Sequence, residues 1–178
     1  MAATKNRYNL PTNPRYAELV KSSSDANETN DCSVKAVALV TGLPYEKAHA
    51  ALDSLGRKAG KGSYTHDILK AVENLGFMPV EVPLAEIISL YPKPHNKLKS
   101  VTTHHPERFA KVWPKGSYLL FSSHHVTAIV DGETVDWTLG RSQRALSVYR
   151  IAPVVEEPPA EAPVVEEPPA EALTLVWN

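Results

Sequence analysis

The chain has 178 residues, 43% of them hydrophobic, and a formal net charge of -1 at pH 7. This length supports one hydrophobic core of ordinary size and excludes two large domains. The single cysteine, Cys32, excludes an intramolecular disulfide, and therefore a disulfide-stapled secreted fold, and it suits a reducing cytoplasm.

Residues 1–24 are predicted to form an extension outside the folded domain. Their opening, MAATKNRYNLPTNPRY, is polar and proline-bearing and has no apolar h-region. Nowhere in the chain do about 18 apolar residues run together, as a membrane span requires. We therefore expect a soluble protein without a signal peptide or membrane contact, located in the cytoplasm, or in the host cytoplasm if the protein is viral.

Three segments with helical periodicity open a predicted domain of residues 25–152. The first is Cys32–Val40 (CSVKAVALV), with Asn30 and Asp31 as capping residues before it and Gly42 as its end. Cys32 thus lies in the first turn of a buried helix. A second helix is predicted between Pro44 and Gly56, and a third from about Thr65 to Leu75, before Gly76.

After Gly76 the pattern becomes mostly extended. Strands are predicted at MPVEV (78–82), YLLFSS (118–123), HHVTAIV (124–130), ETVDW (133–137) and ALSVYRI (145–151). Asp131 and Gly132 favour a type I′ turn between the third and fourth of these strands. Between the strands, LAEIISLY (84–91) is predicted as a helix or turn and PERFAKVW (106–113) as a short helix. A helical half followed by an antiparallel sheet is an α+β domain.

The C-terminal part contains a ten-residue repeat, PVVEEPPAEA, at 153–162 and again at 163–172. Its paired prolines and repelling glutamates predict an extended linker. The tip, Leu173–Asn178, is apolar; it either adds a strand to a sheet edge, its own or a protein partner's, or frays. Because the repeat holds six glutamates and no Lys or Arg, the rest of the chain carries only a small positive excess, and nucleic acid is not expected as a partner.

Cys32, His125 and Asp136 form the pattern that carries chemistry. A helix N-terminus stabilises a thiolate, and a nearby imidazole is needed to share the thiol proton. In a hairpin closed by Asp131 and Gly132, Asp136 faces Thr127, which shares a strand face with His125. The sequence therefore predicts that Asp136 orients the ring of His125, while His124 points to the opposite face.

NDCSVKAVALVTGLPYEKAHAAL, followed far downstream by HHVTAIVDGETVDW, resembles the papain-like cysteine peptidases. The resemblance spans roughly residues 25–151 and is strongest to small members encoded by bacteriophages and to peptidases that trim double-glycine leaders. In that superfamily a cysteine on a helix is followed by a histidine at a strand start and by Asp or Asn on the next strand. This order implies a papain-like fold with Cys32, His125 and Asp136 as the catalytic residues.

The oxyanion site departs from the family pattern. Many relatives place a Gln shortly before the cysteine, and no Gln precedes Cys32 here. Asn27 or Asn30 is expected to substitute, with the backbone N–H of Cys32 as second donor.

The predicted function is hydrolysis of a peptide or isopeptide bond in a peptide or protein substrate through an acyl-enzyme on Cys32. Two alternatives remain open: a cell-wall amidase or endopeptidase, and a non-catalytic papain-like protein that binds a partner.

Other polar segments give weaker signals. The stretch 56–63 (GRKAGKGS) lacks the spacing of a phosphate loop and is predicted to be a basic loop near the cleft, where Arg57, Lys58 and Lys61 attract acidic substrate. His49 is predicted to make a core or cap contact. The remaining histidines lack the spacing of a metal site, so neither a metal nor a cofactor is expected; they are His66, His95, His104 and His105.

Overall fold

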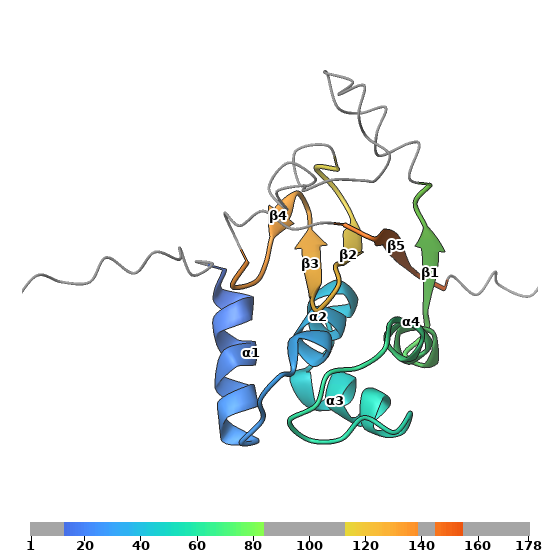
Figure 1. The fold of residues 1–178 in the computed structure, drawn as a ribbon. Coiled ribbons are helices and arrows are strands. Elements are labelled where there is room, and N and C mark those ends of the chain that lie inside the picture. Colours follow the sequence, from blue (N-terminus) through green and yellow to red (C-terminus); the bar gives the residue numbers. More distant parts are fainter. Residues whose placement is uncertain (1–12, 84–112, 139–144, 155–178) are drawn as a thin grey trace, which may run out of the picture.

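The computed structural model describes residues 13–83, 113–138 and 145–154, which form four helices and a five-stranded antiparallel sheet (Figure 1). The helices are α1 (Pro14–Asp25), α2 (Cys32–Thr41), α3 (Tyr45–Asp53) and α4 (Thr65–Asn74). The strands are β1 (Phe77–Glu81), β2 (Ser117–Phe121), β3 (Val126–Val130), β4 (Glu133–Thr134) and β5 (Ser147–Pro153), in the order β1-β5-β2-β3-β4. The α+β prediction is confirmed.

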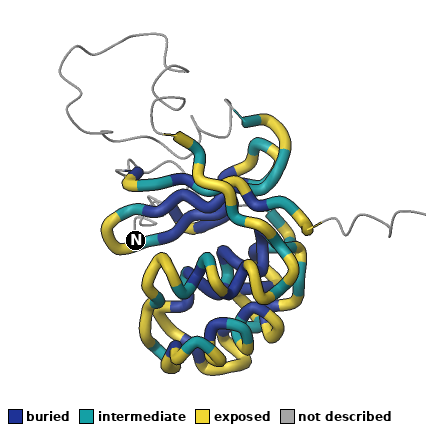
Figure 2. The backbone as a smooth tube through the Cα atoms, turned by 90° about the vertical axis from the view of Figure 1, so that its right-hand side faces the viewer, coloured by how far each residue is buried: buried dark blue, intermediate teal, exposed yellow. Residues whose placement is uncertain are grey.

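The helices lie together on one side of the sheet, and the backbone is most deeply buried where the two layers meet (Figure 2). Among the described residues, no helix is long and apolar enough to cross a membrane. Several predictions fall outside the described residues: the segments 84–91 and most of 106–113, most of the repeat, the tip Leu173–Asn178, and His95, His104 and His105.

α2 is the central helix of the core, and its boundaries match the prediction. Val34, Val37 and Ala38 are fully buried. The helix ends at Gly42, whose φ of +70° lies in the left-handed region that glycine adopts without penalty. The predicted capping is wrong, because the side chain of Asp31 accepts hydrogen bonds from Lys35 Nζ (2.7 Å) and Tyr45 Oη (2.8 Å) instead. Asn30 donates to the carbonyl of Gly60 (3.0 Å).

α1 belongs to the domain, although the sequence pattern places residues 1–24 in an extension. Asn13 caps its first turn by accepting from the N–H of Arg15 (2.9 Å), and Pro14 occupies the first helical position, where proline is tolerated. Tyr16 and Leu19, three residues apart on one helix face, are buried in the main core. The described part of the extension is therefore a core helix.

The β3–β4 hairpin has the predicted turn but a shorter second strand. Asp131 and Gly132 have φ of +47° and +77°, as a type I′ turn requires, and Val130 pairs with Glu133. Strand geometry ends at Thr134 rather than continuing through residue 137. One further bond, from Val135 N to Ala128 O (3.0 Å), continues the register beyond the strand.

β1 forms one edge of the sheet, and its free side is blocked by Pro79. The bonds Val82 N to Val148 O (2.9 Å) and Val154 N to Gly76 O (3.0 Å) show that even-numbered residues of β1 point their backbone groups at β5. Odd-numbered residues, Pro79 at their centre, therefore face outward, and proline has no N–H to donate. An added strand is thus disfavoured at this edge.

The pairing of β1 with β5 also shows that the domain ends later than predicted. Pro153 pairs with Phe77 at the end of β5, and Val154 bonds to Gly76. Pro153, the first residue of the repeat, therefore belongs to β5, and the bond from Val154 continues the pairing, so the folded part extends beyond the predicted boundary at residue 152.

Candidate active site

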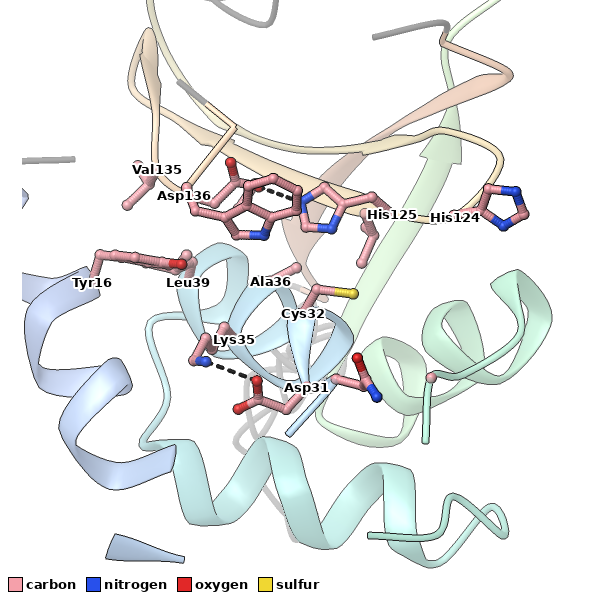
Figure 3. A pocket seen from close by; sticks show the side chains of 15 residues that line it. Tyr16, Asp31, Cys32, Lys35, Ala36, Leu39, His124, His125, Val135 and Asp136 are labelled. Carbon is pink, nitrogen blue, oxygen red and sulfur yellow. Dashed lines mark hydrogen bonds and ion pairs between the residues drawn. The ribbon is translucent and has the colours of Figure 1, made fainter. Parts of the chain in front are cut away.

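Packing of α2 against β3 brings Cys32 and His125 together. Cys32 is the first residue of α2 and is half-buried, while His125 immediately precedes β3. The ring of His125 lies over the Cys32 side chain, whereas His124 is exposed and points away from both (Figure 3). This is the arrangement that strand alternation predicts for the two adjacent histidines.

Asp136 contacts His125 from the far side of the ring. Its Oδ2 lies 2.8 Å from Nε2 of His125, and the two side chains are only 8% and 11% exposed. Its other oxygen, Oδ1, accepts hydrogen bonds from the backbone N–H (2.6 Å) and the hydroxyl of Thr138. Because Asp136 occupies Nε2, the nitrogen left to face Cys32 is Nδ1.

These contacts favour a thiolate paired with an imidazolium. Burial acts to raise the pKa of Cys32, but the hydrogen bond and charge of His125, with backbone N–H groups of Val126 and Ser33, hold it below its ordinary value. Burial acts to lower the pKa of His125, but the hydrogen bonds and negative charges of Asp136 and Cys32 raise it to about 9. Between the lowered thiol pKa and about pH 9, both partners are charged.

Trp137 covers the histidine and is a site residue that the sequence pattern does not reveal. Its ring meets that of His125 edge-on, with centroids 5.0 Å apart and an interplanar angle of 62°. The indole is 39% exposed, so it stands between the His125–Asp136 pair and solvent. Strand alternation would place Trp137 on the face opposite to Asp136, so the sequence carries no signal for this contact; Trp137 reaches the ring because strand geometry already ends at Thr134.

Of the two predicted oxyanion residues, only Asn30 lines the cleft. Asn27 is exposed, and it lines neither of the two cavities that border Cys32. The Nδ2 of Asn30 donates to Gly60, which fixes the side chain at the cleft rim. The N–H of Cys32 lies in the first turn of α2, where backbone donors have no intrahelical partner. The structure therefore supplies a backbone donor beside the thiol and one of the two expected amides nearby.

The cleft extends to both sides of the Cys32–His125 pair. One cavity, of about 490 Å³, lies towards α1, and the other, of about 350 Å³, towards the start of α4. The first is lined by aromatic, aliphatic and paired charged side chains, among them Tyr16, Lys35, Leu39, Val135 and Trp137. The second is rich in hydroxyl groups, from Ser33, Ser63, Tyr64, Thr65, Ser122 and Ser123. Gly62 borders both cavities.

A buried ion pair anchors the loop that carries Gly62. Arg57 contacts Glu28 through two nitrogens, at 3.0 and 3.1 Å, and both side chains are almost fully buried. Glu28 also accepts from the N–H of Gly60 (3.1 Å) and contacts Nε2 of the partly exposed His49 (2.8 Å). Arg57 holds the pKa of Glu28 well below its ordinary range. The prediction that Arg57 attracts substrate is therefore wrong, because its guanidinium is buried against Glu28.

Within the described residues, no group of three or more His, Cys, Asp and Glu side chains is arranged to hold a metal ion. His66 makes an exposed contact with Asp67 (3.0 Å) and stacks against Tyr64.

No protein-family model matches the chain, and no similar curated protein or solved structure was found.

The Glu28–Arg57 pair gives a stability prediction. Glu28→Gln leaves a buried guanidinium without its counter-ion and should lower the free energy of unfolding by about 3 kcal/mol, measured by urea denaturation. Glu73→Gln is the matched control, because Glu73 forms an exposed pair with Lys70 (2.9 Å) and should change stability by less than about 1 kcal/mol. Equal effects of the two substitutions would contradict the anchoring role.

Proposed function

We propose that the chain is a papain-like cysteine hydrolase that cleaves a peptide or isopeptide bond, with Cys32 as nucleophile, His125 as acid and base, and Asp136 as the orienting group. The observation that carries the proposal is the 2.8 Å contact between Asp136 Oδ2 and His125 Nε2, which turns the other ring nitrogen towards a thiol at a helix N-terminus. A structural cysteine needs no such partner. A nucleophile needs both a base and a group that orients the base.

The reaction proceeds in two halves. The thiolate of Cys32 attacks the substrate carbonyl carbon, and the resulting oxyanion is stabilised by the N–H of Cys32, with Asn30 at the cleft rim as a side-chain donor. As the C–N bond breaks, the imidazolium of His125 gives its Nδ1 proton to the leaving amine, which yields a thioester. Neutral His125 then takes a proton from water, whose oxygen attacks the thioester and releases the acid. The thiolate and imidazolium are thereby restored.

The cleft favours a bond inside a longer substrate. Both cavities border Cys32, so substrate can extend from the reacting carbonyl in two directions. A cell-wall amide would undergo the same chemistry, and substrate tests distinguish it from a protein bond. A binding protein would use the cleft without turnover.

A peptidyl vinyl sulfone, which reacts with activated thiolates, tests whether the site is active. Wild type should be labelled on Cys32, and both Cys32→Ala and His125→Ala should lose labelling, with intact mass spectrometry as readout. Cys32→Ser should abolish hydrolysis of a fluorogenic peptide mixture while leaving the melting temperature nearly unchanged, because the hydroxyl is similar in size but far less ionised. Absence of labelling in wild type would favour the binding protein, and turnover by Cys32→Ser would remove Cys32 from the mechanism.

The two adjacent histidines should differ sharply in their effect on turnover. His125→Ala should reduce kcat/KM by at least about a hundredfold, the usual scale for losing a positioned general base. His124→Ala should cost much less, because its side chain points away from Cys32. Asp136→Asn should fall between them, since an amide still holds the ring but stabilises imidazolium less. A larger loss in His124→Ala would contradict the assigned roles of His125 and Asp136.

A further inference from the structure

Asp136 lies beyond the paired part of the sheet. β4 contains only Glu133 and Thr134, and the last backbone bond to β3 comes from Val135. After that residue, the bonds from Thr138 to Asp136 Oδ1 hold the turn together internally, and a long contact between the hydroxyls of Thr138 and Thr127 (3.4 Å) links it to β3 through side chains rather than through backbone pairing. A carboxylate that must stay within hydrogen-bond distance of His125 therefore sits at the end of a two-residue edge strand.

α1 contacts this edge at two points. At its N-terminus, Asn13 Nδ2 donates to Glu133 Oε2 (2.9 Å) on β4. Nearly one turn along the helix, the hydroxyl of Tyr16 lies near the backbone N–H of Trp137, the residue next to Asp136, and this N–H acts to lower the pKa of the phenol. Tyr16 is only 8% exposed, borders the same cavity as Asp136 and Trp137, and extends from α1 towards the space below Asp136 (Figure 3).

α1 is itself well anchored. Leu19 is buried in the main core, and Arg15 donates to the carbonyl of Leu43 (2.7 Å) in the connection between α2 and α3. Contacts from α1 therefore tie the Asp136 turn to the helical layer that also carries Cys32.

We propose that α1 positions the catalytic carboxylate, with Tyr16 holding the Asp136–Trp137 turn against the helical layer and Asn13 holding β4. This inference rests on the proposed function for its catalytic meaning. Tyr16 is a positioning residue, because it acts on His125 through the turn and not on the substrate.

The electrostatic surroundings of Tyr16 suit such a role. Burial and the negative charge of Asp136 raise its pKa to about 12, with smaller contributions from Asp31 and Cys32. The phenol therefore stays neutral at ordinary pH and acts as a hydrogen-bond partner. If the turn moves, His125 loses part of its contact with Asp136, and the ring's pKa should fall from about 9.

Tyr16→Phe removes the hydroxyl while keeping the ring that packs in the core. We expect the titration midpoint of His125, followed by NMR of the ring and assigned with His125→Ala, to fall by about one pH unit. Alkylation of Cys32 by iodoacetamide at mildly acidic pH should slow relative to the rate at alkaline pH, because the thiol pKa rises as the imidazolium becomes less stable. Neither readout requires turnover, so failure of this inference is distinguishable from failure of the proposed hydrolysis.

Two further variants complete the test. Tyr118→Phe is the control, since Tyr118 is buried to a similar extent but borders neither cleft cavity. In this variant the His125 titration midpoint and the pH dependence of Cys32 alkylation should both be unchanged. In Asn13→Ser the serine still caps the helix, but its side chain is too short to reach Glu133. This variant should shift both readouts in the same direction as Tyr16→Phe, but by a smaller amount. If both readouts are unchanged in folded Tyr16→Phe, the proposal is overturned. If that variant does not fold, unchanged readouts in Asn13→Ser would overturn it.

Discussion

The contact between Asp136 and His125 depends on the register of a single hairpin. Because side chains alternate along a strand, a shift of one residue would move His125 away from both Asp136 and Cys32 and would bring His124 forward. The type I′ turn at Asp131 and Gly132 fixes that register with two positive φ angles. The backbone bond from Val135 to Ala128 then carries it far enough for the carboxylate to reach the ring. The chemistry proposed for Cys32 follows from this pairing.

The helical layer supplies the other half of the site. α2 is buried on almost every side, so its first turn has a fixed position beneath β3, and Cys32 is held where backbone N–H groups and an imidazolium both favour a thiolate. The Glu28–Arg57 pair fixes the loop bearing Gly62, and α1 meets the opposite end of the cleft through Tyr16. Residues from α1, α2, the loop bearing Gly62 and the segment after β4 thus surround Cys32.

The sequence predicts the features that have local signals. Gly42 and Gly76 mark the ends of α2 and α4, and Pro44 marks the start of α3. The Asp131-Gly132 pair between alternating strands identifies the hairpin and, through its register, the proximity of His125 to Asp136. Features that depend on distant packing are missed. Tyr16 and Leu19 of α1 are buried only because α2 and the sheet edge pack against them, and the local sequence does not show this packing. Arg57 lies in a glycine-rich basic stretch that predicts exposure, and its burial depends on the distant residue Glu28. Asn27 and Asn30 look equivalent in sequence, yet only the bond to Gly60 places Asn30 at the cleft.

The ionisation of Cys32 is the most direct measure of whether these supports form a reactive centre. The ultraviolet absorbance of the thiolate, taken as the difference between wild type and Cys32→Ala across a pH titration, isolates this one group. The structure predicts a midpoint below the ordinary pKa of a free cysteine, and a return towards that ordinary value in His125→Ala. A wild-type midpoint at or above the ordinary value, unchanged by loss of His125, would contradict the thiolate–imidazolium pair and the function built on it.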